Sequence, residues 1–170
     1  MAVDFKSVLK ASVLLIVLGI TLVISSIILN LVPVLLEEPE AEMLGLAGTG
    51  YSLLLIPIFF ALYFWGGMRA TKKFRLDAAG AGMTSAFAFV VVGTVMMVLE
   101  ILISLLLASG AVAGTSFVSA ASVLASAVFG ATASGDMGIA LSALCGSGVI
   151  IAGALFNFAV GGAGSLLAQR

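Results

Sequence analysis

Residues 11–36, ASVLLIVLGITLVISSIILNLVPVLL, contain no charged side chain. A helix that crosses a membrane needs about 20 consecutive, mainly apolar residues, so this run is long enough for one crossing. Four further uncharged runs follow at residues 43–68, 78–99, 101–135 and 137–169. None has the alternating pattern of a barrel strand, so each is predicted to be helical. The sequence therefore predicts an all-α fold, a polytopic transmembrane helical bundle.

The composition supports a membrane protein. Of the 170 residues, 62% are hydrophobic and only 9% are charged, and the mean hydropathy is +1.33. Water-soluble domains carry about 25% charged residues. We therefore expect the chain to contact the lipid bilayer. A net charge of −1 and the lack of a soluble domain argue against a nucleic-acid partner.

The residue types that carry most chemistry are scarce. Histidine is absent, and the one cysteine, Cys145, lies in an apolar run. The chain therefore lacks the usual residues of His-based acid–base catalysis and of common zinc and haem sites. No GxxxxGK, HExxH or CxxC motif occurs. We expect neither an enzyme nor a bound cofactor or metal.

The basic residues predict the topology. Lys6 and Lys10 precede the first run, and a cluster follows the second run at Arg69, Lys72, Lys73 and Arg75. Under the positive-inside rule both groups face the cytoplasm, which predicts a multi-pass protein of the cell membrane with a cytoplasmic N-terminus. The cluster is also expected to contact lipid headgroups. Tyr63, Phe64 and Trp65, just before it, are expected at the membrane surface as an aromatic belt.

We expect a single transmembrane domain over residues 1–170, with spans near 9–36, 44–68, 79–107 and 138–165. Between the last two spans lies a Ser/Ala-rich stretch whose helix, about 115–131, is expected to be embedded in the membrane or re-entrant. Four spans leave Asp136 outside and return Arg170 to the cytoplasm. Five spans reverse both positions. The charges favour four spans, with five as the alternative.

One carboxylate interrupts an apolar run in VVVGTVMMVLEILISLLLA, residues 90–108. Counted from residue 79 at 1.5 Å per residue, Glu100 lies about 32 Å along its helix, at the outer interface; if the core of the span starts near Gly82, it lies in the outer third of the membrane. A similar count from the other spans predicts an outer polar layer, a candidate intramembrane polar or ion site. Its members are Ser26, Asn30, Thr49, Ser52, Glu100 and Ser104. Such groups face protein or water rather than lipid.

Two helix faces are predicted to pack against other helices. On the third span, steps of three and four residues align small and polar positions with Glu100: Gly82, Ser85, Phe89, Gly93, Met96 and Ser104. In the last span, small residues allow close approach of backbones, with Gly146, Gly153, Asn157 and Gly161 as the packing positions. Asn157 is expected to form an interhelical hydrogen bond. The pattern leaves open whether the partner helices belong to this chain or to another subunit.

Two functions fit these features. The first is a structural or accessory subunit of a homo-oligomer or of a larger membrane complex, held together by small-residue packing. The alternative is a small transporter or channel that uses Glu100 as a proton or cation site, together with the serine-lined residues 116–126.

Overall fold

The computed structural model describes residues 4–31, 40–108 and 136–169 of the chain. These residues form four helices and no strand. The helices are α1 (Phe5–Leu31), α2 (Glu40–Phe74), α3 (Ala78–Ala108) and α5 (Asp136–Ala168). Each contains a segment long and apolar enough to cross a membrane: Phe5–Leu29, Leu53–Phe74, Ala78–Ile103 and Ser147–Ala168. The predicted all-α, multi-pass transmembrane fold is confirmed.

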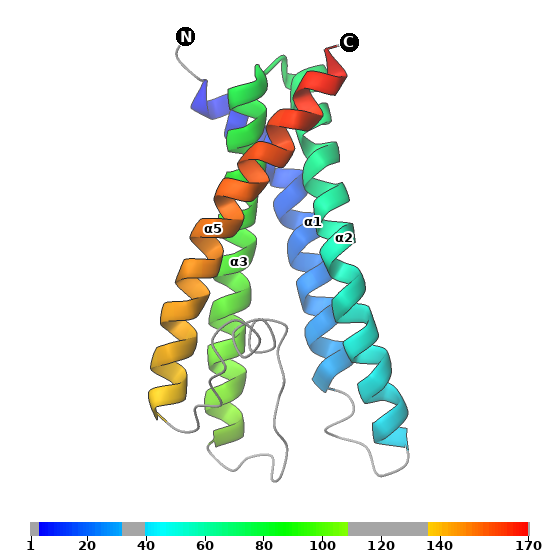
Figure 1. The fold of residues 1–170 in the computed structure, drawn as a ribbon, viewed down its shortest axis with the longest axis vertical. Helices are drawn as coiled ribbons and strands as arrows, with labels where there is room; N and C mark the ends of the chain where they lie inside the picture. The colour runs from blue at the N-terminus through cyan, green and yellow to red at the C-terminus, as the bar shows by residue number, and fades with distance from the viewer. Residues whose placement is uncertain (1–3, 32–39, 109–135, 170) are drawn as a thin grey trace.

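The helices alternate in direction. The beginning of α1, the turn between α2 and α3 and the end of α5 lie at one end of the bundle (Figure 1). The end of α3 and the beginning of α5 both lie at the opposite end. The alternating directions of the described helices fit the four-span arrangement. The embedded helix expected at about 115–131 lies outside the described residues.

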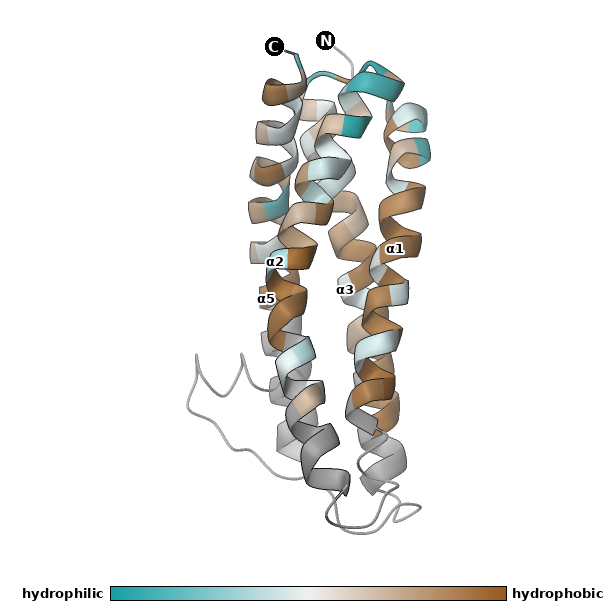
Figure 2. Cartoon of the chain, turned by 90° about the vertical axis from the view of Figure 1, so that its right-hand side faces the viewer, coloured by the Kyte–Doolittle hydropathy of each residue, from teal (hydrophilic) through white to brown (hydrophobic). Residues whose placement is uncertain are grey.

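The end of the bundle that holds the N-terminus is called here the basic end. Its described cations are Lys6, Lys10, Arg69, Lys72, Lys73 and Arg75. Figure 2 shows hydrophilic residues concentrated at this end and hydrophobic residues along the middle of the helices. The charge distribution is thus strongly asymmetric along the bundle axis.

Two clusters of buried residues hold the bundle together, both toward the basic end. One joins α1, α2 and the start of α3 through Val8, Ala11, Ala70, Leu76 and Ala81. The other joins all four helices through Leu15, Tyr63, Ala88 and Val160. Each outer helix, α1 and α5, packs on both α2 and α3, and α2 also contacts α3. The two central helices, α2 and α3, therefore hold both outer helices in place.

A sharp turn links α2 to α3. Arg75 has a positive φ of 55°, its N–H donates to the carbonyl of Thr71 at 3.0 Å, and the N–H of Leu76 donates to the carbonyl of Ala70 at 3.3 Å. The bond from Arg75 to Thr71 is that of the αL motif, a helix C-cap whose left-handed residue is usually glycine. Leu76 is buried in the first cluster together with Ala70, a hydrophobic contact that often accompanies such a cap.

The next residue starts α3. The side chain of Asp77 accepts a hydrogen bond from the N–H of Gly80 at 2.8 Å, and its carbonyl accepts one from Ala81 at 2.9 Å. An N-cap carboxylate of this kind satisfies one of the unpaired amides of the first helical turn. The three residues Arg75, Leu76 and Asp77 therefore reverse the direction of the chain between α2 and α3.

Large apolar side chains cover the outside of the helices. Exposed fractions reach 70% at Leu155, 65% at Ile151 and 62% at Leu53. Such a surface is unfavourable in water but matches hydrocarbon, where helices satisfy all their backbone hydrogen bonds internally. The exposed surface therefore contacts lipid.

The four helices do not stay together over their whole length. Toward the end opposite the basic end, α1 and α2 diverge from α3 and α5 (Figure 1). Near the middle, a Cβ built on Gly19 would lie 2.7 Å from a methyl group of Val92, which marks a close approach of α1 to α3. At a similar level, Phe60 of α2 lies 6.2 Å from Phe156 of α5, measured between ring centroids.

Candidate functional site

The predicted outer polar layer is only partly described. Ser26 is buried in α1, with 9% of its surface exposed. Asn30, Ser52, Glu100 and Ser104 belong to α1, α2 and α3, but their side chains lie outside the described part of the structure, as does that of Thr49. The ion site at Glu100 therefore stays a prediction.

A hydrogen bond between two helices lies near this layer. The hydroxyls of Ser25 and Tyr51 lie 2.7 Å apart and connect α1 to α2. In lipid such a bond is worth roughly 0.6–2 kcal/mol. It holds these two helices together in the half of the bundle where they diverge from α3 and α5.

The packing residues of α5 contact this chain's own helices. A Cβ at Gly153 would overlap the ring of Phe89, and one at Gly161 would overlap the side chain of Ser85 and lie 2.9 Å from the carbonyl oxygen of Ala81. Phe89, Ser85 and Ala81 all belong to α3. The close approach expected from these glycines is therefore intramolecular. Gly146 lies in α5, but its surroundings are not described.

Asn157 lies between these two glycines on α5 and is buried, with 5% of its surface exposed. Its amide nitrogen donates to the carbonyl oxygen of Gly153 at 2.8 Å. The sequence led us to expect a bond to another helix, but this bond stays within α5. The amide is satisfied one turn away because the carbonyl four residues earlier is always within reach of a helical side chain.

The contact of α2 with α5 is also made backbone to backbone. A Cβ at Gly67 would overlap the carbonyl group of Gly161, and one at Gly164 would overlap the carbonyl oxygen of Phe64. One turn beyond Gly67, the hydroxyl of Thr71 donates to the hydroxyl of Ser165 at 2.7 Å. Close backbone contacts at glycines and the hydrogen bond of Thr71 to Ser165 thus join the parallel helices α2 and α5 near the basic end.

The polar face of α3 is turned inward. A Cβ at Gly82 would lie 2.7 Å from the carbonyl oxygen of Phe158, and one at Gly93 would lie 3.2 Å from Ile150, both in α5. Ser85 donates to the backbone carbonyl of Tyr63 in α2 at 3.0 Å. These hydroxyl groups and small residues are used in helix contacts rather than being left free for a ligand.

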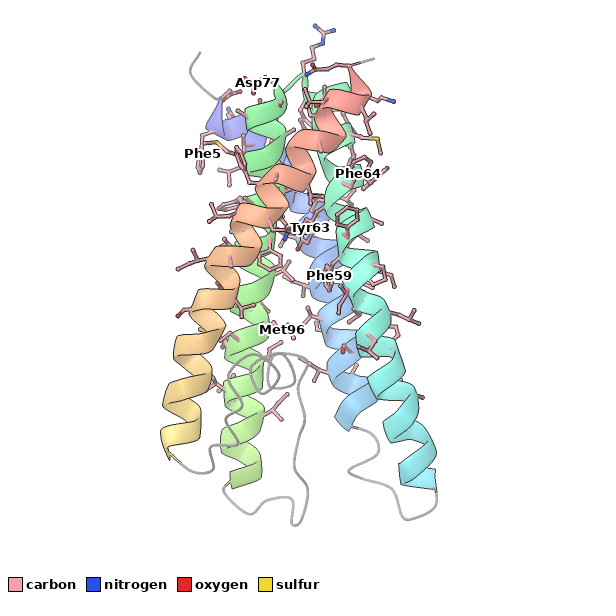
Figure 3. All side chains as sticks on the ribbon, in the orientation of Figure 1. Phe5, Phe59, Tyr63, Phe64, Asp77 and Met96 are labelled. Atoms are coloured by element: carbon pink, nitrogen blue, oxygen red, sulfur yellow. The ribbon has the colours of Figure 1, made fainter. Side chains whose placement is uncertain are left out.

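Tyr63 is the residue that the sequence misplaced. It was expected in an aromatic belt at the headgroups, but α2 continues nine residues beyond Trp65 to Phe74, and Tyr63 is only 1% exposed. Its ring packs on Phe59 at 6.0 Å and edge-on to Phe89 at 5.8 Å, between ring centroids. Figure 3 shows Tyr63 in the interior of the bundle. The expectation for Tyr63 was wrong because the sequence does not show which side of α2 packs on the other helices.

The Tyr63 hydroxyl is buried without a hydrogen-bond partner in the described part of the chain. An unpaired buried polar group costs about 1–3 kcal/mol. No sequence signal marks this group, since its burial depends on three other helices. It is the one polar side-chain atom in the described residues that packing leaves buried and unsatisfied.

Of the four cations expected at the headgroups, Arg69, Lys72 and Lys73 lie in the last turns of α2, within its apolar segment Leu53–Phe74, and Arg75 directly follows the helix. The guanidinium of Arg69 lies 5.6 Å from the ring centroid of Trp65, a cation–π distance. Lys72, Lys73 and Arg75 are exposed. Whether they contact lipid headgroups stays a prediction.

No group of three or more His, Cys, Asp or Glu side chains that could hold a metal occurs among the residues described. Comparison with known protein families, with curated proteins and with solved structures gave no match to this chain. Its four membrane-spanning helices define it as a multi-pass membrane protein.

Proposed function

We propose that this chain is a non-enzymatic membrane protein that acts as a structural or accessory subunit of a homo-oligomer or of a larger membrane complex. The observation that carries the proposal is a second row of small residues on α5, on its outward face. Gly148, Ala152, Ala159 and Ala163 are all exposed. A Cβ built on Gly148 meets no atom within 4 Å.

This outward row differs from the inward glycines. Gly153 and Gly161 contact helices of this chain, whereas the four outward positions are exposed and a Cβ at Gly148 meets no described atom within 4 Å. In lipid, helices gain little from the hydrophobic effect on meeting, and small residues favour association because backbones can approach closely. The outward row therefore offers a surface on which another helix can pack.

The experiment is native mass measurement of the protein extracted in mild detergent. We expect a mass above the 17.1 kDa of one chain. The double substitution Ala152→Leu and Ala159→Leu should lower the assembled fraction because it fills the surface with bulk. Ala61→Leu, an equivalent change at an exposed alanine of α2, is the control and should leave assembly unchanged. A stable monomer that conducts ions in liposomes would contradict the proposal.

A second candidate is a small transporter or channel that uses Glu100 as a proton or cation site. The divergence of the two helix pairs at the end opposite the basic end favours it, because that is the half of the bundle in which Glu100 lies. Glu100→Gln should then abolish ion flux in liposomes without changing assembly. Unchanged flux together with reduced assembly would eliminate this candidate.

We further propose that the protein lies in the cell membrane with the basic end in the cytoplasm. The support is the placement of six cations at the end that also holds the N-terminus. Reporter fusions at the two termini should both report a cytoplasmic location. A periplasmic or extracellular signal from either fusion would contradict this orientation.

A further inference from the structure

The outward face of α2 changes character along its length. Leu54 and Ile58 are 60% and 40% exposed, Trp65 is 42% exposed, and Arg69 and Lys72 follow toward the basic end. These positions are separated by three, four or seven residues, so they share one side of the helix. Toward the basic end, this side presents apolar side chains first, then the indole of Trp65, and then the guanidinium of Arg69 and the ammonium of Lys72.

The cations of this face have no ion-pair partner in the part of the chain that the structure describes, where none of the Lys or Arg side chains lies within ion-pair distance of a carboxylate. The two described carboxylates at this end cap helices: Asp77 accepts from the N–H of Gly80, and Asp4 accepts from the N–H of Lys6. The positive charge of α2 is therefore available to an external anion.

The dimensions match one lipid leaflet. From Ile58 to Lys72 is fourteen residues along α2, about 21 Å at 1.5 Å per residue. Half of a bilayer, including its headgroups, is about 20–22 Å thick. A phospholipid aligned with the helix can thus place its acyl chains on the apolar part and its phosphate at the cations.

We propose that Ile58, Trp65, Arg69 and Lys72 form a binding site for an anionic phospholipid. The acyl chains lie along Ile58, the glycerol region contacts the indole of Trp65, and the phosphate is held by Arg69 and Lys72. The guanidinium is held near the indole by the cation–π contact, so less freedom is lost when it binds a phosphate. A water-soluble polyanion is disfavoured because the cations are continuous with a face that contacts lipid.

The chain contains one tryptophan, and it lies within the proposed site. Its fluorescence therefore reports on lipid at this position without labelling. The protein is placed in vesicles of phosphatidylcholine with phosphatidylglycerol, and one of the two lipids carries brominated acyl chains that quench tryptophan. We expect brominated phosphatidylglycerol to quench Trp65 more strongly than its mole fraction in the vesicle predicts, and brominated phosphatidylcholine less strongly.

The test variant is Arg69→Gln with Lys72→Gln, which retains the reporter. Each basic residue near a membrane surface contributes about a fivefold preference for anionic lipid, so the double change should lower the preference by up to about 25-fold. Lys6→Gln with Lys10→Gln is the matched control, because it removes the same charge from α1 at the same end. The control should retain most of the preference.

Equal losses in the two variants would show a diffuse surface potential and overturn the α2 site, and so would no loss in either. Inorganic phosphate, added at the concentration of the anionic headgroups, should leave the quenching unchanged. Displacement of the lipid by phosphate would show a site for a soluble anion and would overturn the assignment to a phospholipid.

Discussion

Gly67→Ala tests the closest contact between α2 and α5. The added Cβ would overlap the carbonyl oxygen of Gly161 and would lie 2.7 Å from its carbonyl carbon and 2.8 Å from its Cα. Backbone atoms cannot rotate away, and ordinary contact begins at 3.4 Å, so the helices must separate by roughly 1 Å. Overpacking of this kind costs about 1–3 kcal/mol. The separation also weakens the hydrogen bond of Thr71 to Ser165, one turn away.

Alanine favours a helix over glycine by up to about 1 kcal/mol, which offsets part of this cost. We expect a net loss of about 1 kcal/mol, roughly a fivefold change in the unfolding equilibrium constant. The assay is reversible unfolding in mixed micelles of mild and denaturing detergent. Gly50→Ala, on the same helix, is the control because a Cβ there meets no atom within 4 Å. Equal stability of the two variants would refute the backbone contact of α2 with α5.

Four further predictions follow from single groups. Tyr63→Phe removes a buried hydroxyl without a described partner, so stability in the same assay should stay equal or rise by about 1–2 kcal/mol; a clear loss would reveal a partner for the hydroxyl. Arg75→Gly relieves a left-handed backbone at φ 55° and should raise stability by about 1 kcal/mol, and lowered stability would contradict the strain argument. Asp77→Ala removes the N-cap of α3 and should cost about 1 kcal/mol, whereas Asp77→Asn should retain most of the stability. The hydrogen bond from the Ser7 hydroxyl holds the pKa of Asp4 below its ordinary value of 3.8. The ionised carboxylate therefore stabilises the start of α1 above pH 3.8, and this stabilisation is lost as the pH falls through the lowered pKa. Amide hydrogen exchange in the first turn of α1 should accelerate in that acidic range, and a pH-independent protection would contradict the capping role.

The first three spans were readable from the chain because they depend on local quantities. Charges at residues 37–42, at Arg69 and its neighbours, and at Asp77 separate the apolar runs that become α1, α2 and α3. The inward face of α3 was also readable, since Gly82 and Ser85 recur at helical spacing with Glu100. Small and polar residues are poor lipid-facing choices, so their alignment indicates a packed side.

The position of Tyr63 was not readable. Its neighbours in the chain, Phe64 and Trp65, suggest a membrane surface, yet Tyr63 is buried in the bundle while Trp65 stays exposed. Nor did the chain show that Asn157 bonds within its own helix. Both outcomes depend on which side of a helix meets a neighbour, and apolar residues surround every side.

The sequence by itself determined the helical class, the first three crossings and the concentration of positive charge at one end, because the free energy of transfer into lipid acts residue by residue. Only the tertiary structure decided which glycines meet backbone, such as Gly67 against Gly161, and which hydroxyl is buried unpaired at Tyr63. The physical reason is that lipid and protein interior are similarly apolar, so hydropathy does not distinguish a lipid-facing side from a packed one. Shape distinguishes them, and shape exists only when the helices are together.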